Sequence, residues 1–217
     1  MIHLNLANPE NNKLEILCLG AHSDDIEIGC GGTILRLVTQ YPGCVIHWVV
    51  FSATGTREKE ARLAATLFAG KATLNGPLLK VFPDGFMPFV GAELKVVFEE
   101  LKKTVNPDLI FTHYGKDAHQ DHRQVSELTW STFRDHLILE YEIPKYDGDM
   151  GQPNLFVPLT QAIYQKKIQI IMDVFQSQHP KHWFDQSTFL SLMRIRGVEC
   201  NAPSGYAEAF HCRKMTL

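Results

Sequence analysis

The 217-residue sequence predicts an α/β protein built on an open, mainly parallel sheet. Two observations predict this class. Apolar runs of strand length alternate with longer runs of helical periodicity through residue 136. In addition, two of the apolar runs are followed directly by loops rich in histidine and aspartate, and in such sheets ligands bind beyond the carboxyl ends of the strands.

The first apolar run, residues 14–19, has the length and composition of a strand. A turn is expected at Gly20. A glycine-rich stretch, residues 29–32, then leads into an amphipathic run over residues 33–40, which predicts a helix. This order predicts a strand, a polar loop, a glycine-rich entry and a helix.

The middle of the chain repeats the alternation. Residues 45–51 form a continuous apolar run, which is typical of a strand whose sheet is covered on both faces. Further strands are predicted at residues 78–82, 109–111 and 137–141, and helices at residues 57–69, 93–104 and 120–133. This succession favours βαβ units, in which consecutive strands run parallel.

The last third of the chain opens with residues 144–158, which are rich in proline, glycine and aspartate and predict a long surface loop. A loop of this length in a compact domain is usually functional or mobile. Helices are predicted at residues 159–178 and 187–196, and residues 206–210 are expected to pack back as a strand or extended chain.

Composition indicates a soluble, cytoplasmic protein. The net charge of −3 means that the chain has no excess of basic residues with which to bind nucleic acid or an anionic membrane. No apolar run reaches spanning length, and the polar start is not a signal peptide. Five cysteines without a CxxC motif fit reduced thiols. Residues 1–217 are expected to form one domain, with residues 1–13 as a loose or edge-pairing arm; a homo-oligomer is compatible with the sequence.

The loop after the first predicted strand places an imidazole and two carboxylates within four residues. His22 and Asp25 are spaced to bend back onto one metal ion, which leaves Asp24 free beside them. The plain alternative is a turn with solvated carboxylates, in which Asp25 caps the helix.

The loop after the strand at residues 109–111 is equally rich in such groups, with His113, Asp117, His119, Asp121 and His122. His119 and His122 stand three residues apart at an expected helix start, so that one can bind a metal while the other faces a substrate. Histidines in a single loop are commonly exposed or cap a helix. The recurrence of the pattern after two different strands favours a metal site instead.

Combined, the two loops supply two imidazoles and one carboxylate. Three protein ligands with an open fourth position are the pattern of catalytic zinc, where the pKa of a bound water falls towards ~7. Asp24 is then a spare base and His119 a spare acid, and Asp121 could hold an imidazole in one tautomer. Arg57, after the second predicted strand, either grips a substrate hydroxyl or phosphate or is a solvated arginine at a helix start.

The segments AHSDD with GCGG, and DAHQDH after a strand, resemble the motifs of the PIG-L / LmbE-like de-N-acetylases. SATGTREKEARLAA is similar to that family's second loop and helix, and GYAEAF to its C-terminal signature, so the resemblance extends over most of the chain. It implies a Rossmann-like α/β fold with helices on both faces of the sheet. It also implies a zinc-dependent hydrolase that removes the acetyl group from an N-acetylglucosamine-type sugar or conjugate, releasing acetate and a free amine.

The resemblance further implies a role for each matching residue. His22, Asp25 and His122 would hold one zinc ion per chain. Asp24 would be the general base. His119 would act as the acid or steady the oxyanion.

Two positions depart from the family pattern. Ser23 stands where the family commonly has proline, which loosens the turn but removes no ligand. Asp117 stands where some members carry a tyrosine. The group that assists the metal in holding the oxyanion is therefore left open.

Three other functions are compatible with parts of the sequence. Two histidines and one carboxylate also form the triad of non-haem Fe(II) enzymes, so that Fe²⁺ is an alternative metal. A nucleotide-binding module is disfavoured, because the glycine cluster is not GxGxxG and lies well past the strand. A non-catalytic sugar- or metal-binding protein would not need Asp24 and His119. The exact substrate and the physiological metal are open.

Overall fold

The helices and strands follow the alternation that the sequence predicts. A computed structural model of the chain describes residue 6 and residues 13–216, so the expected arm over residues 1–13 lies almost wholly outside the described residues. The strands are β1 Glu15–His22, β2 Val45–Ser52, β3 Thr73–Leu79, β4 Leu109–His113, β5 Leu137–Tyr141, β6 Leu155–Pro158 and β7 Ala207–His211. The helices are α1 Asp25–Gln40, α2 Thr56–Ala69, α3 Gly91–Thr104, α4 Gln120–Thr132, α5 Gln161–Val174 and α6 Gln186–Glu199, with short 3₁₀ turns at Met87–Val90 and Gln176–Gln178.

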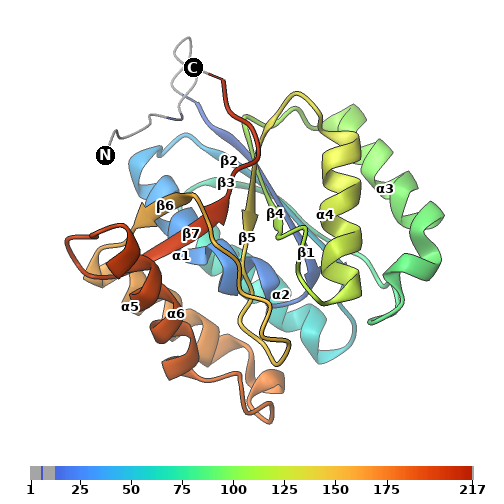
Figure 1. Cartoon of the computed structure of the whole chain (residues 1–217). Helices are drawn as coiled ribbons and strands as arrows, with labels where there is room; N and C mark the ends of the chain where they lie inside the picture. The colour runs from blue at the N-terminus through green and yellow to red at the C-terminus, as the bar shows by residue number, and fades with distance from the viewer. Residues whose placement is uncertain (1–5, 7–12, 217) are drawn as a thin grey trace.

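The seven described strands form one sheet in the order β3-β2-β1-β4-β5-β7-β6 (Figure 1). The five strands from β3 to β5 run parallel. β7 is antiparallel to both of its neighbours, β5 and β6. The predicted fold class, an open and mainly parallel sheet of an α/β protein, is therefore confirmed. The single domain expected over residues 1–217 stays a prediction.

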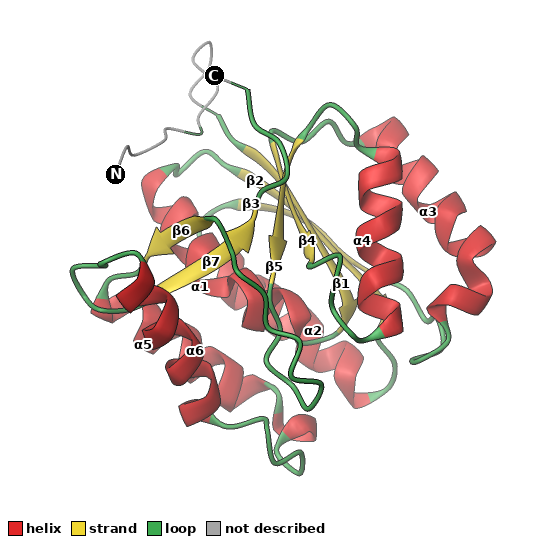
Figure 2. Ribbon diagram, viewed as in Figure 1, coloured by secondary structure: helices red, strands yellow, loops and turns green. Residues whose placement is uncertain are grey.

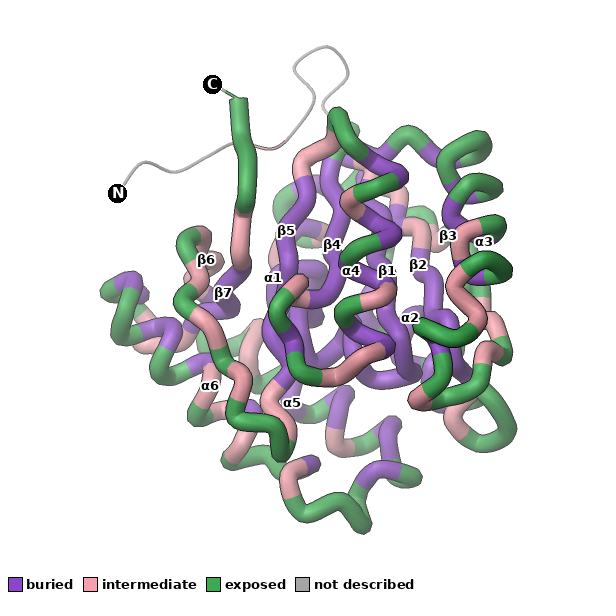
Figure 3. Tube along the Cα trace, turned by 45° about the vertical axis from the view of Figure 1, so that its right-hand side comes forward, coloured by how far each residue is buried: buried purple, intermediate pink, exposed green. Residues whose placement is uncertain are grey.

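Helices cover both faces of the sheet (Figure 2). One apolar cluster joins the sheet to α1, α2, α5 and α6, and a second joins it to α3 and α4. In β1, Ile16 and Cys18 belong to the first cluster, whereas Leu17 and Leu19 belong to the second. This burial on both faces explains why the strand is a continuous apolar run, and the central strands form the buried interior in Figure 3. No helix in the described part of the chain is long and apolar enough to cross a membrane.

The first unit differs from its prediction in two respects. β1 continues through the expected turn at Gly20 and ends at His22, because the chain keeps pairing with β2 there. α1 then begins at Asp25, so that the glycine-rich stretch lies inside the helix. A Cβ at Gly29 would come within 2.2 Å of the Tyr141 ring, and one at Gly31 within 2.5 Å of the Phe68 ring. The glycines thus allow close packing of α1 and do not form a ligand-binding loop.

The third strand also lies elsewhere than predicted. β3 covers residues 73–79, whereas the sequence predicted a strand at residues 78–82. The observed strand contains Gly76 and Pro77, which are turn-forming residues in most contexts. β3 lies at the edge of the sheet, and an edge strand tolerates proline because one of its sides needs no ladder donor.

Two further differences from the prediction lie in the second half of the chain. The predicted surface loop over residues 144–158 ends in β6, a short edge strand that pairs with β7. The helix predicted at residues 159–178 ends at Val174 as α5. The tail forms β7, as expected.

The strand order decides where a ligand can bind. From β1 the chain builds β2 and β3 on one side and then returns to place β4 on the other side of β1. In an open α/β sheet, this switch point leaves a crevice beyond the carboxyl ends of the two central strands. His22 ends β1 and His113 ends β4, so both motif loops start at this crevice.

Candidate metal centre

The three predicted ligand side chains meet at the switch point. His22 is the last residue of β1, Asp25 is the first residue of α1, and His122 lies in the first turn of α4. All three are buried, with 6%, 3% and 3% of their surface exposed. Residues that are 100 positions apart in sequence are thus brought into direct contact.

The ligand atoms of these residues face one another. The Nδ1 atom of His22 lies 3.3 Å from Nε2 of His122 and 3.4 Å from Oδ2 of Asp25. Oδ1 of Asp25 lies 3.5 Å from Nε2 of His122. Two imidazole nitrogens and a carboxylate oxygen within 4.8 Å of one another are a donor set that fits a divalent metal ion such as zinc.

The second nitrogen of His122 is held by a carboxylate. Nδ1 of His122 lies 2.9 Å from Oδ2 of Asp117, which is itself buried. Burial and the nearby charge of His113 lower the pKa of His122 to about 4. The imidazole is therefore neutral at physiological pH, and a hydrogen bond from Nδ1 to Asp117 leaves the Nε2 lone pair for a metal.

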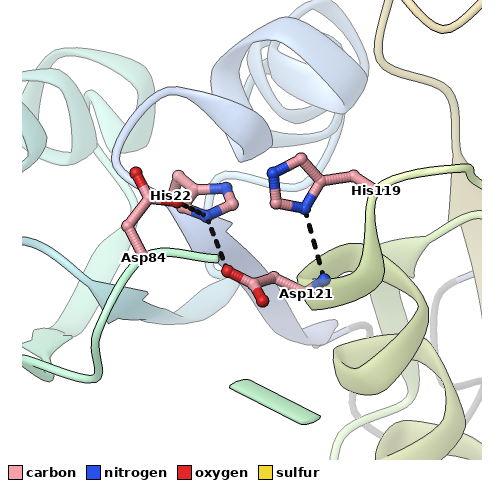
Figure 4. Close-up of side chains that lie close together, drawn as sticks. All are labelled: His22, Asp84, His119 and Asp121. Atoms are coloured by element: carbon pink, nitrogen blue, oxygen red, sulfur yellow. Dashed lines mark hydrogen bonds and ion pairs between the residues drawn. The ribbon is translucent and has the colours of Figure 1, made fainter. Parts of the chain in front are cut away.

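The second nitrogen of His22 is also held by carboxylates (Figure 4). Its Nε2 atom lies 3.0 Å from Oδ1 of Asp84 and 3.2 Å from Oδ2 of Asp121. Burial opposes protonation of His22, but the hydrogen bonds to Asp121, Asp25 and Asp84 outweigh it and raise the pKa of His22 well above its usual value. The surroundings of His22 therefore stabilise positive charge.

Asp121 connects two parts of the site. Besides the contact with His22, its carboxylate accepts hydrogen bonds from the backbone N–H groups of Gly85 and Met87, at 2.6 and 3.0 Å. These bonds fix the turn that carries Asp84. The structure thus places Asp121 against an imidazole, as the sequence suggested, and identifies that imidazole as His22.

Asp24 lies beside the ligand set and outside it. Its carboxylate is buried and forms an ion pair with Arg57, at 3.1 Å from Nη2 to Oδ1. Burial raises the pKa of Asp24, although the charge of Arg57 acts against this shift. Arg57 also lies 3.7 Å from Asp84, and its side chain is 22% exposed. It is therefore not the solvated arginine that the sequence offered as one alternative; its contact with a substrate stays a prediction.

His119 stands next to the ligand set. Its Nδ1 atom accepts the backbone N–H of Asp121 at 3.2 Å, which caps α4. Its ring meets the His22 ring edge-on, with centroids 5.0 Å apart, and stacks on the His122 ring at 4.5 Å. Burial and the charge of His22 lower the pKa of His119. Because Nδ1 accepts a hydrogen bond, the proton of the neutral ring lies on Nε2, where it can be donated.

The structure places three further residues at the site, His113, Tyr141 and Asp84, to which the sequence assigned no role. His113 stacks on His122 with ring centroids 3.9 Å apart, and its Nε2 atom lies 3.2 Å from Asp25. The hydroxyl of Tyr141 lies 3.3 Å from the same nitrogen. Both residues end strands, which is the signal that could have found them. Asp84 carried no such signal, because its sequence context indicates only a turn.

The long segment between β5 and β6 packs against the second motif loop. The Nζ atom of Lys145 lies 3.0 Å from Oδ1 of Asp117 and 2.6 Å from Oδ2 of Asp149. Asp149 in turn accepts the backbone N–H of Ala118 at 2.6 Å. The segment therefore borders the site, which agrees with the functional role that a predicted loop of this length suggests.

A comparison with protein families finds a match over the region that builds the site. The model of the PIG-L family, described as GlcNAc-PI de-N-acetylase, matches residues 17–133. This match covers more than half of the chain and includes both motif loops. The uncharacterized deacetylase YaiS of Escherichia coli K12 is 29% identical over 152 residues, which cover 64% of this chain and 79% of YaiS.

Solved structures share the fold at low sequence identity. The conserved protein TT1542 of Thermus thermophilus has a TM-score of 0.73 and 22% identity, covering 94% of this chain and 96% of its own. The N,N'-diacetylchitobiose deacetylase of Pyrococcus horikoshii has a TM-score of 0.65 and 19% identity, covering 96% and 86%. GalB of Pseudomonas putida KT2440, a 4-carboxy-2-hydroxymuconate hydratase, has a TM-score of 0.70 and 18% identity, covering 94% and 98%. The shared fold therefore does not by itself determine the reaction.

Proposed function

Because the chain belongs to the PIG-L family of de-N-acetylases, we propose that it is a metal-dependent amidohydrolase acting on an N-acetylated sugar or sugar conjugate of the N-acetylglucosamine type. It removes the acetyl group from the amide nitrogen and releases acetate and a free amine. The observation that carries this proposal is the convergence of His22, Asp25 and His122, with Asp24 and His119 beside them.

His22, Asp25 and His122 would hold one zinc ion per chain. When bound there, zinc would supply Lewis-acid polarisation of the amide carbonyl and activation of a water molecule. The neutral imidazole of His122 and the carboxylates around His22 support the binding of a cation at this position. The same ligand set also accommodates Fe²⁺, which is the alternative metal.

Asp24 and His119 carry the proton transfers in this proposal. Asp24 accepts the proton of the attacking water, and its raised pKa makes it a stronger base than an exposed aspartate. The water oxygen forms a bond to the carbonyl carbon, and the carbon–nitrogen bond of the amide breaks. The Nε2–H group of His119 donates a hydrogen bond to the oxyanion, and either protonated Asp24 or the imidazolium form of His119 gives a proton to the departing amine.

The substrate class is supported by the names of related proteins. The family model is described for the N-acetylglucosamine group of GlcNAc-PI, and one similar structure is a deacetylase of N,N'-diacetylchitobiose. We accordingly propose a small N-acetylated amino sugar or its conjugate as the substrate. We also propose a cytoplasmic location. The net charge of −3 offers no basic footprint for a nucleic-acid partner.

Acetate and amine release by the zinc-loaded protein tests the proposal. The panel contains N-acetylglucosamine, N,N'-diacetylchitobiose and a nucleotide-linked N-acetylglucosamine, with chelator-treated and zinc-restored protein side by side. We expect release from at least one compound, its loss with the chelator and its return with zinc. Sugar binding without release would favour a non-catalytic binding protein, whereas Fe²⁺-dependent consumption of O₂ would favour the iron enzyme; either result overturns the proposal.

A further inference from the structure

Asp117 is held from three directions. Oδ2 lies 2.9 Å from Nδ1 of His122. Oδ1 accepts the backbone N–H of His119 at 2.7 Å and lies 3.0 Å from Nζ of Lys145. Only 3% of the residue is exposed. Rotation of the carboxylate would break several of these contacts together, so its orientation is fixed.

Among the groups that contact Asp117, Lys145 is the most distant in sequence. It lies on the segment between β5 and β6, and its side chain is 7% exposed. Its ammonium contacts Asp149 at 2.6 Å as well as Asp117, and Asp149 accepts the N–H of Ala118. A solvated surface ion pair contributes little to stability. This ion pair is buried instead, and it connects the segment between β5 and β6 to the motif loop after β4.

We propose that Asp117 and Lys145 are positioning residues for the metal ligand His122. Lys145 and the His119 N–H group hold Oδ1, which turns Oδ2 toward Nδ1 of His122. The proton of the imidazole is thereby kept on Nδ1, and Nε2 points at the ligand atoms of His22 and Asp25. This inference rests on the metal site of the proposed function and assigns it a supporting residue from a separate segment of the chain.

The charge of Lys145 makes it possible to distinguish a positioning role from direct electrostatic repulsion between Lys145 and the metal ion. A positive charge near a bound cation repels it, so removal of the charge alone would tighten metal binding. Loss of the positioning contact would weaken metal binding instead. The two accounts therefore predict opposite signs for the same substitution.

The experiment measures zinc affinity of the full chain by competition with a chromogenic chelator. Lys145→Met is expected to weaken binding by about tenfold, within the range for groups that orient metal ligands. Lys116→Met is the matched control, because Lys116 is an exposed lysine next to Asp117, and we expect a change of less than about twofold. Asp117→Glu keeps the charge but displaces the carboxylate, and it should also weaken binding by about tenfold or more.

A double substitution tests whether Lys145 influences zinc affinity through Asp117. If Lys145 acts through Asp117, Lys145→Met should cost little further affinity in a protein that already carries Asp117→Asn. The absorption spectrum of the Co²⁺-substituted protein, which reports ligand geometry, should change in Asp117→Glu and stay the same in Lys116→Met. Unfolding of the zinc-free variants is followed in parallel, and Lys145→Arg, which keeps the charge, is the conservative variant that we expect to retain affinity within about threefold.

Wild-type or tighter zinc binding by folded Lys145→Met overturns the inference, as does an equal loss in the Asp117→Asn background. If Lys145→Met does not fold, wild-type affinity in Asp117→Glu decides against it. A wild-type protein that binds no zinc removes the proposed metal site together with this inference. Zinc-binding wild-type protein with unaffected variants removes the inference alone.

Discussion

Asp24 and Asp25 are neighbours in sequence, yet their side chains have opposite electrostatic surroundings. Burial would raise the pKa of Asp25, but the charges of His122 and His113 outweigh it and hold that pKa well below its usual value. Asp24 forms an ion pair with Arg57, but burial raises the pKa of Asp24 and outweighs the lowering effect of the Arg57 charge. The first environment suits a permanently ionised ligand, and the second suits a group that takes up a proton.

Substitution of the two aspartates by asparagine should therefore have different consequences. Asp25→Asn should weaken metal binding, because a neutral group replaces an anionic ligand. Asp24→Asn should retain the metal and lower kcat by roughly two to four powers of ten, which is the usual contribution of a positioned general base. Metal content and steady-state kinetics of both variants check this prediction. A nearly fully active Asp24→Asn protein with zinc bound would contradict the proposed mechanism.

At the scale of single elements, α1 is held by a buried ion pair. Lys167 of α5 and Glu208 of β7 lie 2.6 Å apart and are 2% and 4% exposed. Lys167 donates to the carbonyl of Ile28, and Glu208 accepts the backbone N–H groups of Gly32 and Thr33. The glutamate of the GYAEAF segment thus satisfies backbone groups of the glycine-rich helix, which is a structural role.

Lys167→Met should lower the free energy of unfolding by about 3–5 kcal/mol, because it leaves the Glu208 carboxylate buried without its partner. Lys166→Met is the matched control, since Lys166 is the preceding residue on α5 and is exposed. That variant should change the same free energy by less than about 0.5 kcal/mol. Urea denaturation of the zinc-free proteins measures both. Equal stability of the two variants would show that the ion pair does not hold α1.

The segment between β5 and β6 carries an exposed aromatic side chain next to Lys145 in sequence. Tyr146 follows Lys145, is 68% exposed, and stacks on His182 with ring centroids 5.6 Å apart. We expect Tyr146→Ala to change the relative kcat/KM values among N-acetyl sugars while metal content stays the same, because loops near a site choose substrates. Tyr164→Ala on α5 is the control truncation. Unchanged selectivity in Tyr146→Ala would make the segment a spacer.

At the scale of the whole molecule, the site links two halves of the sheet. β1 and α1 supply His22 and Asp25, whereas α4, which follows β4, supplies His122. A metal ion bound between them would stabilise the folded chain over the unfolded one, in which these residues are far apart.

Zinc should therefore raise the thermal unfolding midpoint of the wild-type protein. At a free concentration one hundred times the dissociation constant, the stabilisation is about 2.7 kcal/mol. His122→Ala should lose most of the shift, and a chelator should reverse the shift in the wild type. His136→Ala, which truncates a histidine after α4 that pairs with Asn106, is the control and should keep the shift. An unchanged zinc shift in His122→Ala would remove that residue from the ligand set.

Much of the fold could be predicted because its signals are local. Burial of β1 and β2 on both faces makes each a continuous apolar run, and the amphipathic pattern of α3 and α4 has the helical period. β3 was misplaced because Gly76 and Pro77 indicate a turn, and only its position at the sheet edge makes them acceptable. The glycines of α1 were misread because the Tyr141 and Phe68 rings that require them come from distant segments.

For the site, the sequence by itself determined which residue types follow which strands. His22, Asp25 and His122 could be proposed together because parallel strands bring their carboxyl ends to one edge. The tertiary structure alone decided which groups surround them: Asp84 and Asp121 against His22, Arg57 against Asp24, and Lys145 against Asp117. These contacts depend on strand order and on the path of two connecting segments, and neither leaves a periodic pattern in the sequence.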